Sequence, residues 1–273
     1  MLKIENMTYA YDVSFGNVIK HITMDFDCGK IIGILGINGS GKSTIMKGIM
    51  GLHPLNEGHV IYNYNKLSLK KQELYRYRQD VCIVFQDSDQ QLFYALVEDD
   101  VALALKNLHY DEATIKQRVH DALEAMHISH LGKQPIHYLS FGQKKRVAIA
   151  GVLALKPKYL LLDEPTAGLD PRGRVQMLQL MKELAQNGTT IILTSHDMDL
   201  MYDCCDYAYV VDKGEIVLEG NKQDIFLEKD VLEKIGLSLP WIVKLHLALG
   251  TPLCENEIEF FRTIGSEKTW QNQ

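Results

Sequence analysis

The sequence predicts an α/β fold with a mostly parallel sheet, and three observations carry that prediction. The stretches "KYLLLDE" and "GTTIILTS" are continuous apolar runs of the kind found in parallel strands that are buried on both faces. Between them, "PRGRVQMLQLMKELAQ" has helical periodicity. Earlier in the chain, the apolar run "GKIIGILG" leads into the glycine-rich "GINGSGKST", which is the order expected of a strand, a loop and a helix.

The N-terminal elements are predicted in sequence order as follows. Residues 1–35 read as the strands "LKIENMTYAY", "IKHITMDF" and "GKIIGILG", which are separated by Gly and Asp turns. A helix is expected from Lys42 to about Met50. Strand-like alternation then resumes at "HVIYNY" and again at "DVCIVFQ".

The second half of the chain changes character twice. From about Glu98 to Leu155 the periodicity is helical, so the parallel sheet brackets a helical insertion. After the two buried strands, "YAYVVDKGEIVLEG" predicts a hairpin around Lys213-Gly214. Past about Asn221 the pattern weakens into short helical pieces, including "PWIVKLHLALG". We therefore expect residues 1–220 to form the main domain, with a helical part at about 87–155, and residues 221–273 to form a C-terminal extension.

Composition narrows the class of protein. Apolar residues make up 46% and charged residues 23% of the chain, as in an ordinary globular protein. The net charge of −6 argues against nucleic-acid binding through the phosphate backbone. The chain shows no secretion leader and no apolar run of about 18 residues, and its five cysteines have no CxxC spacing. These features predict a soluble cytoplasmic chain with reduced thiols.

The strongest single motif is "GINGSGKS", residues 36–43, which matches G-x-x-x-x-G-K-[ST]. Its glycines let backbone N–H groups curl around phosphates. Lys42 is then placed to reach the β- and γ-oxygens, and the Ser43 hydroxyl can ligate Mg²⁺. The alternative interpretation, a glycine-rich turn, is weak here because an apolar strand precedes the motif and a helix follows it.

Two buried strands end in polar side chains. "YLLLDEP" ends in Asp163, which can hold Mg²⁺ through water, and Glu164, which is placed to accept a proton from an attacking water. "TSHD" ends the next strand with His196, where a γ-phosphate contact is expected because parallel sheets bind ligands at the carboxyl ends of their strands. Taken alone, His196 is more typical of a structural or capping residue.

A second anion site is predicted far from the first. "LSFGQKKR", residues 139–146, begins with the hydroxyl of Ser140 and the small Gly142 and runs into a helix. A helix N-terminus presents unpaired N–H groups and a positive dipole end, which suits a phosphate. One chain therefore carries two phosphate-binding motifs about a hundred residues apart.

The ordered set "GINGSGKST", "FQ" at Phe85-Gln86, "LSFGQ", "LLLDEPTAGLD" and "TSHD" resembles the nucleotide-binding subunit of ABC transporters over roughly residues 2–220. The resemblance implies a P-loop NTPase fold: a RecA-like, mostly parallel core with an antiparallel β subdomain, a helical subdomain and a small C-terminal extension. It implies hydrolysis of ATP with Mg²⁺. Gln86 would sense the metal and the water, Glu164 would be the base and His196 the γ-phosphate switch, with Lys42 on the phosphates. The implied metal ligands are Ser43, Gln86 and Asp163, and the implied ATP-binding residues are Tyr11 (stacked on adenine), Gly36, Asn38, Gly39, Ser40, Gly41, Lys42, Ser43, Thr44, Ser140, Gly142, Gln143 and Asp170.

The same resemblance implies a reason for two phosphate motifs. In this family two subunits lie head to tail, and each ATP is held by the phosphate loop of one subunit and the signature "LSFGQ" of the other. The partner ATPase would be a copy of this chain or a paralogue, and Asp170 would lie in the loop between subunits. The signature departs from the common LSGGQ at Phe141, which bears on the local backbone geometry.

A narrower resemblance, to the cobalt-type ATPases of energy-coupling-factor (ECF) importers, rests on "VFQDSDQQLF…VEDDVAL", "LSFGQKKRVAIAGVLAL", "PTAGLDP" and "SLPWIVKLHLALG". It implies a peripheral subunit on the cytoplasmic face of the membrane. The implied partners are a transmembrane coupling protein and a substrate-binding membrane protein, with no nucleic acid. The solute would be cobalt or a related transition-metal ion, and a vitamin is the alternative. A non-transport ABC ATPase fits less well because the chain has one cassette and no heptad run, and a P-loop kinase would have no use for "LSFGQ" or Glu164.

Three other features allow two interpretations each. His127, His130 and His137 lie close in sequence, but no carboxylate or thiol completes a metal set, so a loop without metal is favoured. Cys204-Cys205 reads as half-buried helix residues rather than a redox pair. "QDSDQQLFYALVEDD", residues 86–100, carries the acids Asp87, Asp89, Glu98, Asp99 and Asp100 beside the apolar Leu92 and Phe93, and it predicts an acidic socket for an arginine-bearing helix of the membrane partner, with a solvated loop as the alternative.

Overall fold

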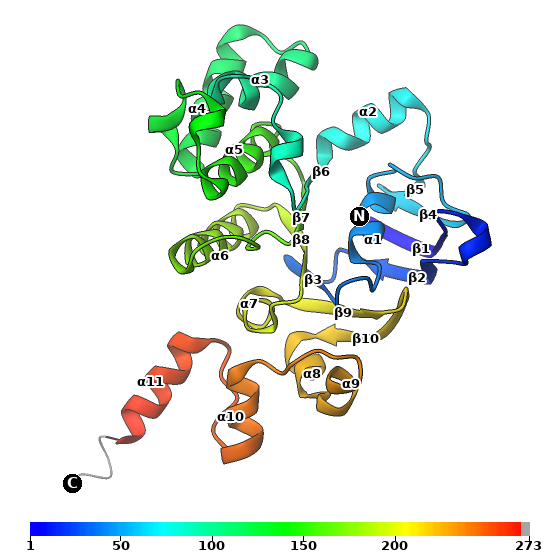
Figure 1. Cartoon of the computed structure of the whole chain (residues 1–273), viewed down its shortest axis with the longest axis vertical. Helices are drawn as coiled ribbons and strands as arrows, with labels where there is room; N and C mark the ends of the chain where they lie inside the picture. The colour runs from blue at the N-terminus through cyan, green and yellow to red at the C-terminus, as the bar shows by residue number, and fades with distance from the viewer. Residues whose placement is uncertain (269–273) are drawn as a thin grey trace.

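The computed structural model describes residues 1–268, which form two sheets, a group of helices at one end and a helical C-terminal region at the other (Figure 1). The larger sheet has the strand order β10-β9-β3-β8-β7-β6. Its parallel strands are β3 (Ile31–Leu35), β6 (Val81–Val84), β7 (Tyr159–Asp163), β8 (Thr190–Ser195) and β9 (Tyr207–Asp212), and β10 (Glu215–Asn221) pairs antiparallel with β9. The predicted parallel core and the hairpin at Lys213-Gly214 are confirmed.

Both faces of this sheet are covered, which explains the continuous apolar runs. In β3, Ile31 and Leu35 belong to the hydrophobic cluster on one face, whereas Ile32 and Ile34 belong to the cluster on the other. Successive side chains of a strand point to opposite faces, so a strand with two covered faces favours apolar residues at consecutive positions. The first cluster includes the helices of the insertion, and the second includes the smaller sheet.

The smaller sheet is antiparallel, with the order β2-β1-β4-β5. Its strands are β1 (Leu2–Tyr9), β2 (Ile19–Asp25), β4 (Glu57–Tyr62) and β5 (Asn65–Lys66), and α1 (Lys42–Ile49) packs in the same cluster. The predicted strand "HVIYNY" ends at Tyr62, because Asn63 and Tyr64 adopt positive φ angles of 48° and 66° and turn the chain into β5.

The helical insertion lies between β6 and β7, as predicted, and gathers at one end of the molecule (Figure 1). Its helices are α3 (Val97–Asn107), α4 (Glu112–Ala125) and α5 (Phe141–Leu153). The short 3₁₀ turn η2 (Ser88–Gln91) precedes α3, and the turns η3 (Ser129–Leu131) and η4 (Ile136–Tyr138) lie between α4 and α5. The helix α2 (Lys71–Asp80), which precedes β6, was not predicted, because it is strongly polar and buries a single side chain, Tyr77. A further 3₁₀ turn, η1 (Val13–Phe15), lies between β1 and β2.

The C-terminal region is helical and shares the main core. After α6 (Pro171–Gln186) and α7 (Met198–Cys204), the chain forms α8 (Lys222–Leu227), α9 (Lys229–Lys234), α10 (Trp241–Leu249) and α11 (Glu257–Lys268). Phe226, Leu232 and Val243 are fully buried in the same cluster as the core strands. The domain division at 220/221 stays a prediction. Within residues 1–268 there is no helix long and apolar enough to cross a membrane.

Candidate functional site

The predicted phosphate loop connects β3 to α1 and is shaped by its glycines. Gly41 has a φ of +112°, and a Cβ there would lie 2.7 Å from Ile19 Cδ1. At Gly36 a Cβ would lie 2.4 Å from both Ser40 Oγ and the carbonyl of Val211. Since neither position has room for a side chain, the loop can wrap tightly at the N-terminus of α1, where N–H groups point outward.

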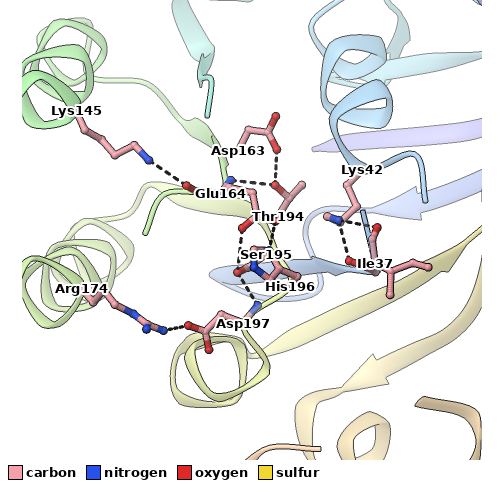
Figure 2. A network of polar contacts seen from close by, with 11 residues as sticks. Ile37, Lys42, Lys145, Asp163, Glu164, Arg174, Thr194, Ser195, His196 and Asp197 are labelled. Carbon is pink, nitrogen blue, oxygen red and sulfur yellow. Dashed lines mark hydrogen bonds and ion pairs between the residues drawn. The ribbon is translucent and has the colours of Figure 1, made fainter. Parts of the chain in front are cut away.

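Lys42 begins α1 and is 6% exposed. Its Nζ donates to the carbonyls of Gly36 at 2.8 Å and Ile37 at 3.0 Å, so the ammonium lies over its own loop (Figure 2). Burial lowers the pKa of Lys42, and the nearby carboxylates of Glu164 and Asp163 oppose that shift. The arrangement holds a cation where phosphate oxygens would bind.

A cavity of about 430 Å³ opens above the loop and collects residues from five separate parts of the sequence. Tyr11 and Val18 come from the β1–β2 connection, and Gln86, Glu164 and His196 follow β6, β7 and β8. The loop itself contributes Asn38, Gly39, Gly41, Lys42, Ser43 and Thr44. The carboxyl ends of three parallel strands therefore meet at the phosphate loop, as expected of ligand sites in such sheets.

The acidic end of the cavity is built by β7 and β8. Thr194 Oγ1 donates to Asp163 Oδ1 at 2.5 Å and accepts from the backbone N–H of Glu164 at 3.1 Å. Asp163 is 5% exposed and does not line the cavity. Thr194 thus fixes both acids from the neighbouring strand, a role that no sequence pattern indicated.

Glu164 faces the cavity and contacts the predicted switch histidine. His196 Nδ1 lies 3.0 Å from Glu164 Oε1, and Ser195 Oγ lies 3.4 Å from Oε2 (Figure 2). The side chain of His196 is 59% exposed, whereas that of Glu164 is 8% exposed. A carboxylate between a histidine and a hydroxyl, at the edge of a phosphate cavity, is suited to accept a proton from water.

Tyr11 lies at the rim of the same cavity. Its ring is exposed and its hydroxyl is 3.0 Å from Thr44 Oγ1. Tyr9 and His53 meet Tyr11 edge-on, at 5.1 and 5.6 Å between ring centroids. One face of an anchored aromatic ring at the mouth of a phosphate cavity can stack on a base.

The signature residues are placed elsewhere. Ser140, Gly142, Gln143 and Asp170 line a different cavity, of about 540 Å³, together with Phe141 and Arg146. Ser140 caps α5 in a capping box: its N–H donates to Gln143 Oε1 at 2.9 Å, and its Oγ accepts from Gln143 N. Helix α5 therefore starts regularly despite Phe141. The structure thus divides most of the predicted ATP-binding residues between two cavities, whereas Gly36 and Ser40 line neither of them.

Most acids of the segment 86–100 already have partners within this chain. Asp100 is 7% exposed and accepts from the N–H groups of Phe93 and Tyr94 at 2.7 and 2.8 Å, so it cannot serve the predicted socket. Asp89 pairs with Lys144 at 2.9 Å, and Asp99 pairs with Lys106 at the same distance. Phe93 is 74% exposed, as an apolar contact would require.

Two further sequence hypotheses concern a histidine cluster and a pair of cysteines. His127 and His130 line the signature cavity, and among residues 1–268 no group of three or more potential metal ligands is found. Cys204 and Cys205 are both free and buried rather than half-buried, at the end of α7.

Comparisons with known proteins agree with this architecture. A family model described as ABC transporter matches residues 19–167. The cobalt import ATP-binding protein CbiO of Salmonella typhimurium is 46% identical, covering 90% of this chain and 91% of that protein. The energy-coupling factor transporter ATP-binding protein EcfA2 of Clostridium perfringens is 41% identical, covering 100% and 97%.

Two solved structures show the same fold. CbiO1 from Clostridium perfringens, described as part of the ABC transporter complex cbiONQ, superposes with a TM-score of 0.78 at 41% identity, covering 90% of this chain and 98% of that one. The ATP-binding cassette MJ0796, a dimer in a post-hydrolysis state bound to ADP and Pi, gives a TM-score of 0.74 at 27% identity, covering 81% and 99%.

Proposed function

This chain belongs to the ABC transporter family as an ATP-hydrolysing subunit close to the CbiO and EcfA energy-coupling-factor ATPases, and we propose that it drives an ECF-type importer from the cytoplasmic face of the membrane. The observation that carries the proposal is the cavity where Lys42, Glu164 and His196 meet, while the signature lines another cavity. An ATPase whose signature binds the nucleotide of a neighbouring subunit requires its signature and its own phosphate loop to lie in separate cavities.

In the proposed reaction, Lys42 and the loop N–H groups bind the β- and γ-phosphates of ATP. Glu164 accepts the proton of the water that attacks the γ-phosphorus, and the bond to the β–γ bridging oxygen breaks to release ADP and phosphate. His196 orients the Glu164 carboxylate through the 3.0 Å contact and can reach the γ-phosphate from the cavity side.

The residues present fit Mg²⁺. Ser43 and Gln86 line the cavity and Asp163 stands behind it, and all three offer the oxygen ligands that this hard cation requires. Thr194 Oγ1 donates to one carboxylate oxygen of Asp163, so the other oxygen would be left to hold the ion through water. When bound, Mg²⁺ neutralises charge on the β- and γ-oxygens.

The chain is proposed to work with a second ATPase subunit, which is itself or a paralogue, and with membrane proteins. CbiO1, the similar solved structure, is described as part of a complex with further components, which supports this assembly. For the solute we propose cobalt or a related transition-metal ion, because a 46% identical relative is named a cobalt import protein. A vitamin is the second candidate, since EcfA2 is named only for energy coupling.

Replacing Glu164 with Gln tests the reaction. Because the amide cannot accept the proton, steady-state hydrolysis by the purified transporter should fall by about 10²–10⁴-fold, while ATP binding persists. Glu183→Gln, an exposed carboxylate-to-amide change on α6, is the matched control and should retain full turnover. Near-normal hydrolysis by the Glu164 variant would refute the assignment of the base.

The solute is tested by uptake of labelled cobalt into cells that carry the transporter. ATP-dependent accumulation that disappears with Glu164→Gln supports the metal assignment. Accumulation of a vitamin and not of cobalt, under the same conditions, would replace it.

A further inference from the structure

A lysine outside the recognised motifs connects the signature helix to the candidate base. Lys145, in α5, is 1% exposed, and its Nζ donates to the carbonyls of Glu164 at 3.1 Å and Ala167 at 3.2 Å (Figure 2). The ring of Phe141 lies 5.4 Å from the same ammonium. Burying a cation costs free energy unless the cation is paired and hydrogen-bonded. The two carbonyls therefore compensate for the burial of the Lys145 ammonium.

The peptide that Lys145 holds is strained. Glu164 has a φ of +49°, a left-handed conformation that costs a non-glycine residue about 1–3 kcal/mol and persists where the surroundings over-determine it. On one side, the N–H of Glu164 donates to Oγ1 and to the carbonyl of Thr194, at 3.1 and 3.2 Å. On the other side, the carbonyl of Glu164 accepts from Lys145 and from Ala167 N at 3.1 Å. Both ends of the residue are therefore clamped.

The loop that follows Glu164 is tied to α5 a second time. The ring of Phe141 packs against Gly168, where a Cβ would come within 2.7 Å of Phe141 Cε1. Phe141 and Lys145 are four residues apart in α5 and lie on one helix face. One face of α5 thus grips residues 164–168 at two points, and the N-terminus of the same helix carries Ser140 and Gly142 in the signature cavity.

We propose that Lys145 is a positioning residue that ties α5 to the backbone of Glu164. Nucleotide bound at the signature of a chain then determines the position of the Glu164 base in that same chain. The inference rests on the proposed function, namely on Glu164 as the base and on shared sites. Because the two cavities of a chain would serve different ATP molecules, Lys145 makes hydrolysis at one site depend on occupancy of the other.

The first test separates positioning from binding. Lys145→Met keeps the length of the side chain and removes both hydrogen bonds, so kcat of the purified transporter should fall by about tenfold or more while the KM for ATP stays within about twofold. Lys116→Met is the control, since this lysine is exposed on α4, outside the phosphate loop and the signature, and should keep kcat. A loss confined to KM, or an unchanged kcat, would overturn the proposal.

The second test uses mixed dimers of two differently tagged copies, and both arrangements carry the same two substitutions. In one dimer, Lys145→Met and Glu164→Gln share a chain and the partner supplies the working base. In the other, they lie on opposite chains and the working base belongs to the Lys145→Met chain. We expect the first dimer to match a reference dimer carrying Glu164→Gln alone on one chain, and the second to lose about tenfold in turnover.

Any effect of Lys145→Met on folding is common to both dimers, so the difference between them reports the connection to Glu164. Equal turnover in the two dimers, or a larger loss in the first, would show that Lys145 serves the signature or the fold instead. A different result would show that the proposed function itself is wrong: a dimer with Glu164→Gln on both chains would still hydrolyse ATP.

Discussion

At the scale of single residues, the packing of Phe141 against Gly168 explains how an aromatic ring fits into a signature where glycine is usual. The ring uses space that Gly168 leaves free, and Gly168 has a φ of +75°. Two requirements therefore meet at Gly168: a backbone conformation that favours glycine and a missing side chain.

We predict that Gly168→Ala destabilises the protein more than Gly188→Ala. Both glycines have positive φ, +75° and +97°, but a Cβ at Gly188 would meet nothing within 4 Å. Gly188→Ala should cost about 1–2 kcal/mol from the backbone alone, and Gly168→Ala should add a steric contribution. Denaturant unfolding measures both.

Adding Phe141→Gly isolates the steric contribution. The double variant should recover the excess cost of Gly168→Ala, because the clashing ring is gone. Equal losses for the two glycine variants, or no recovery in the double variant, would refute the packing argument.

At the scale of elements, the C-terminal helices share the core of the ATPase. Phe226 in α8 has no exposed surface and meets Tyr202 of α7 edge-on, at 5.4 Å between ring centroids. The backbone N–H of Trp241 donates to Asp199 Oδ1 at 2.8 Å, which ties the start of α10 to α7. Helices held in this way should unfold together with the sheet.

We predict that Phe226→Ala lowers the free energy of unfolding by about 3–5 kcal/mol and leaves a single transition. Leu227→Ala, at a neighbouring side chain that is 38% exposed, should cost much less. Circular dichroism and tryptophan fluorescence, followed together against denaturant, check this outcome. Two separate transitions would instead support an independent extension beginning near residue 221.

A second prediction at this scale concerns the 3₁₀ turn η2 and the membrane partner. Asp87 caps η2 by accepting from Asp89 N at 3.3 Å and Gln90 Nε2 at 2.9 Å, directly after the cavity residue Gln86. Asp87→Lys should release the membrane coupling protein by reversing the charge that its arginines would meet, while the isolated subunit still binds ATP. Co-purification and uptake report the loss.

Asp111→Lys is the matched control, since Asp111 also caps a helix start, that of α4, with its side chain. Both variants lose a capping acid, so their common effect is structural. An intact complex and normal uptake with Asp87→Lys would reject the docking surface.

At the scale of the whole molecule, the two cavities constrain how two subunits can be arranged in a dimer. The phosphate-loop cavity and the signature cavity have different linings, and Glu164 connects them, because it lines the cavity of Lys42 and its carbonyl accepts from Lys145 of α5. A head-to-tail dimer would complete both cavities at once.

We predict that a mixed dimer in a Glu164→Gln background, with Lys42→Ala on one chain and Gly142→Asp on the other, retains one tightly held nucleotide. In shared sites both defects fall in the same site, so the other stays whole. Placing both changes on one chain is the control, and it should leave none. No nucleotide in the first dimer and one in the control would show that each chain binds its own ATP with both motifs.

The sequence by itself determined the local features of this protein. Continuous apolar runs indicated covered strands, and helical periodicity placed α6 at residues 171–186. The loop and strand-end motifs named Lys42, Ser43, Glu164 and His196 of the cavity, because each signal lies within a few neighbouring positions. Only the tertiary structure decided which distant groups meet. Thr194 donates to Asp163, and Lys145 donates to the carbonyl of Glu164. Asp100 accepts from a backbone N–H group, and Phe226 packs in the main core. The physical reason is that burial and hydrogen-bond partners are properties of the packed chain: a lysine or an aspartate reads as a surface charge in sequence until folding supplies the buried carbonyl or N–H group that it satisfies.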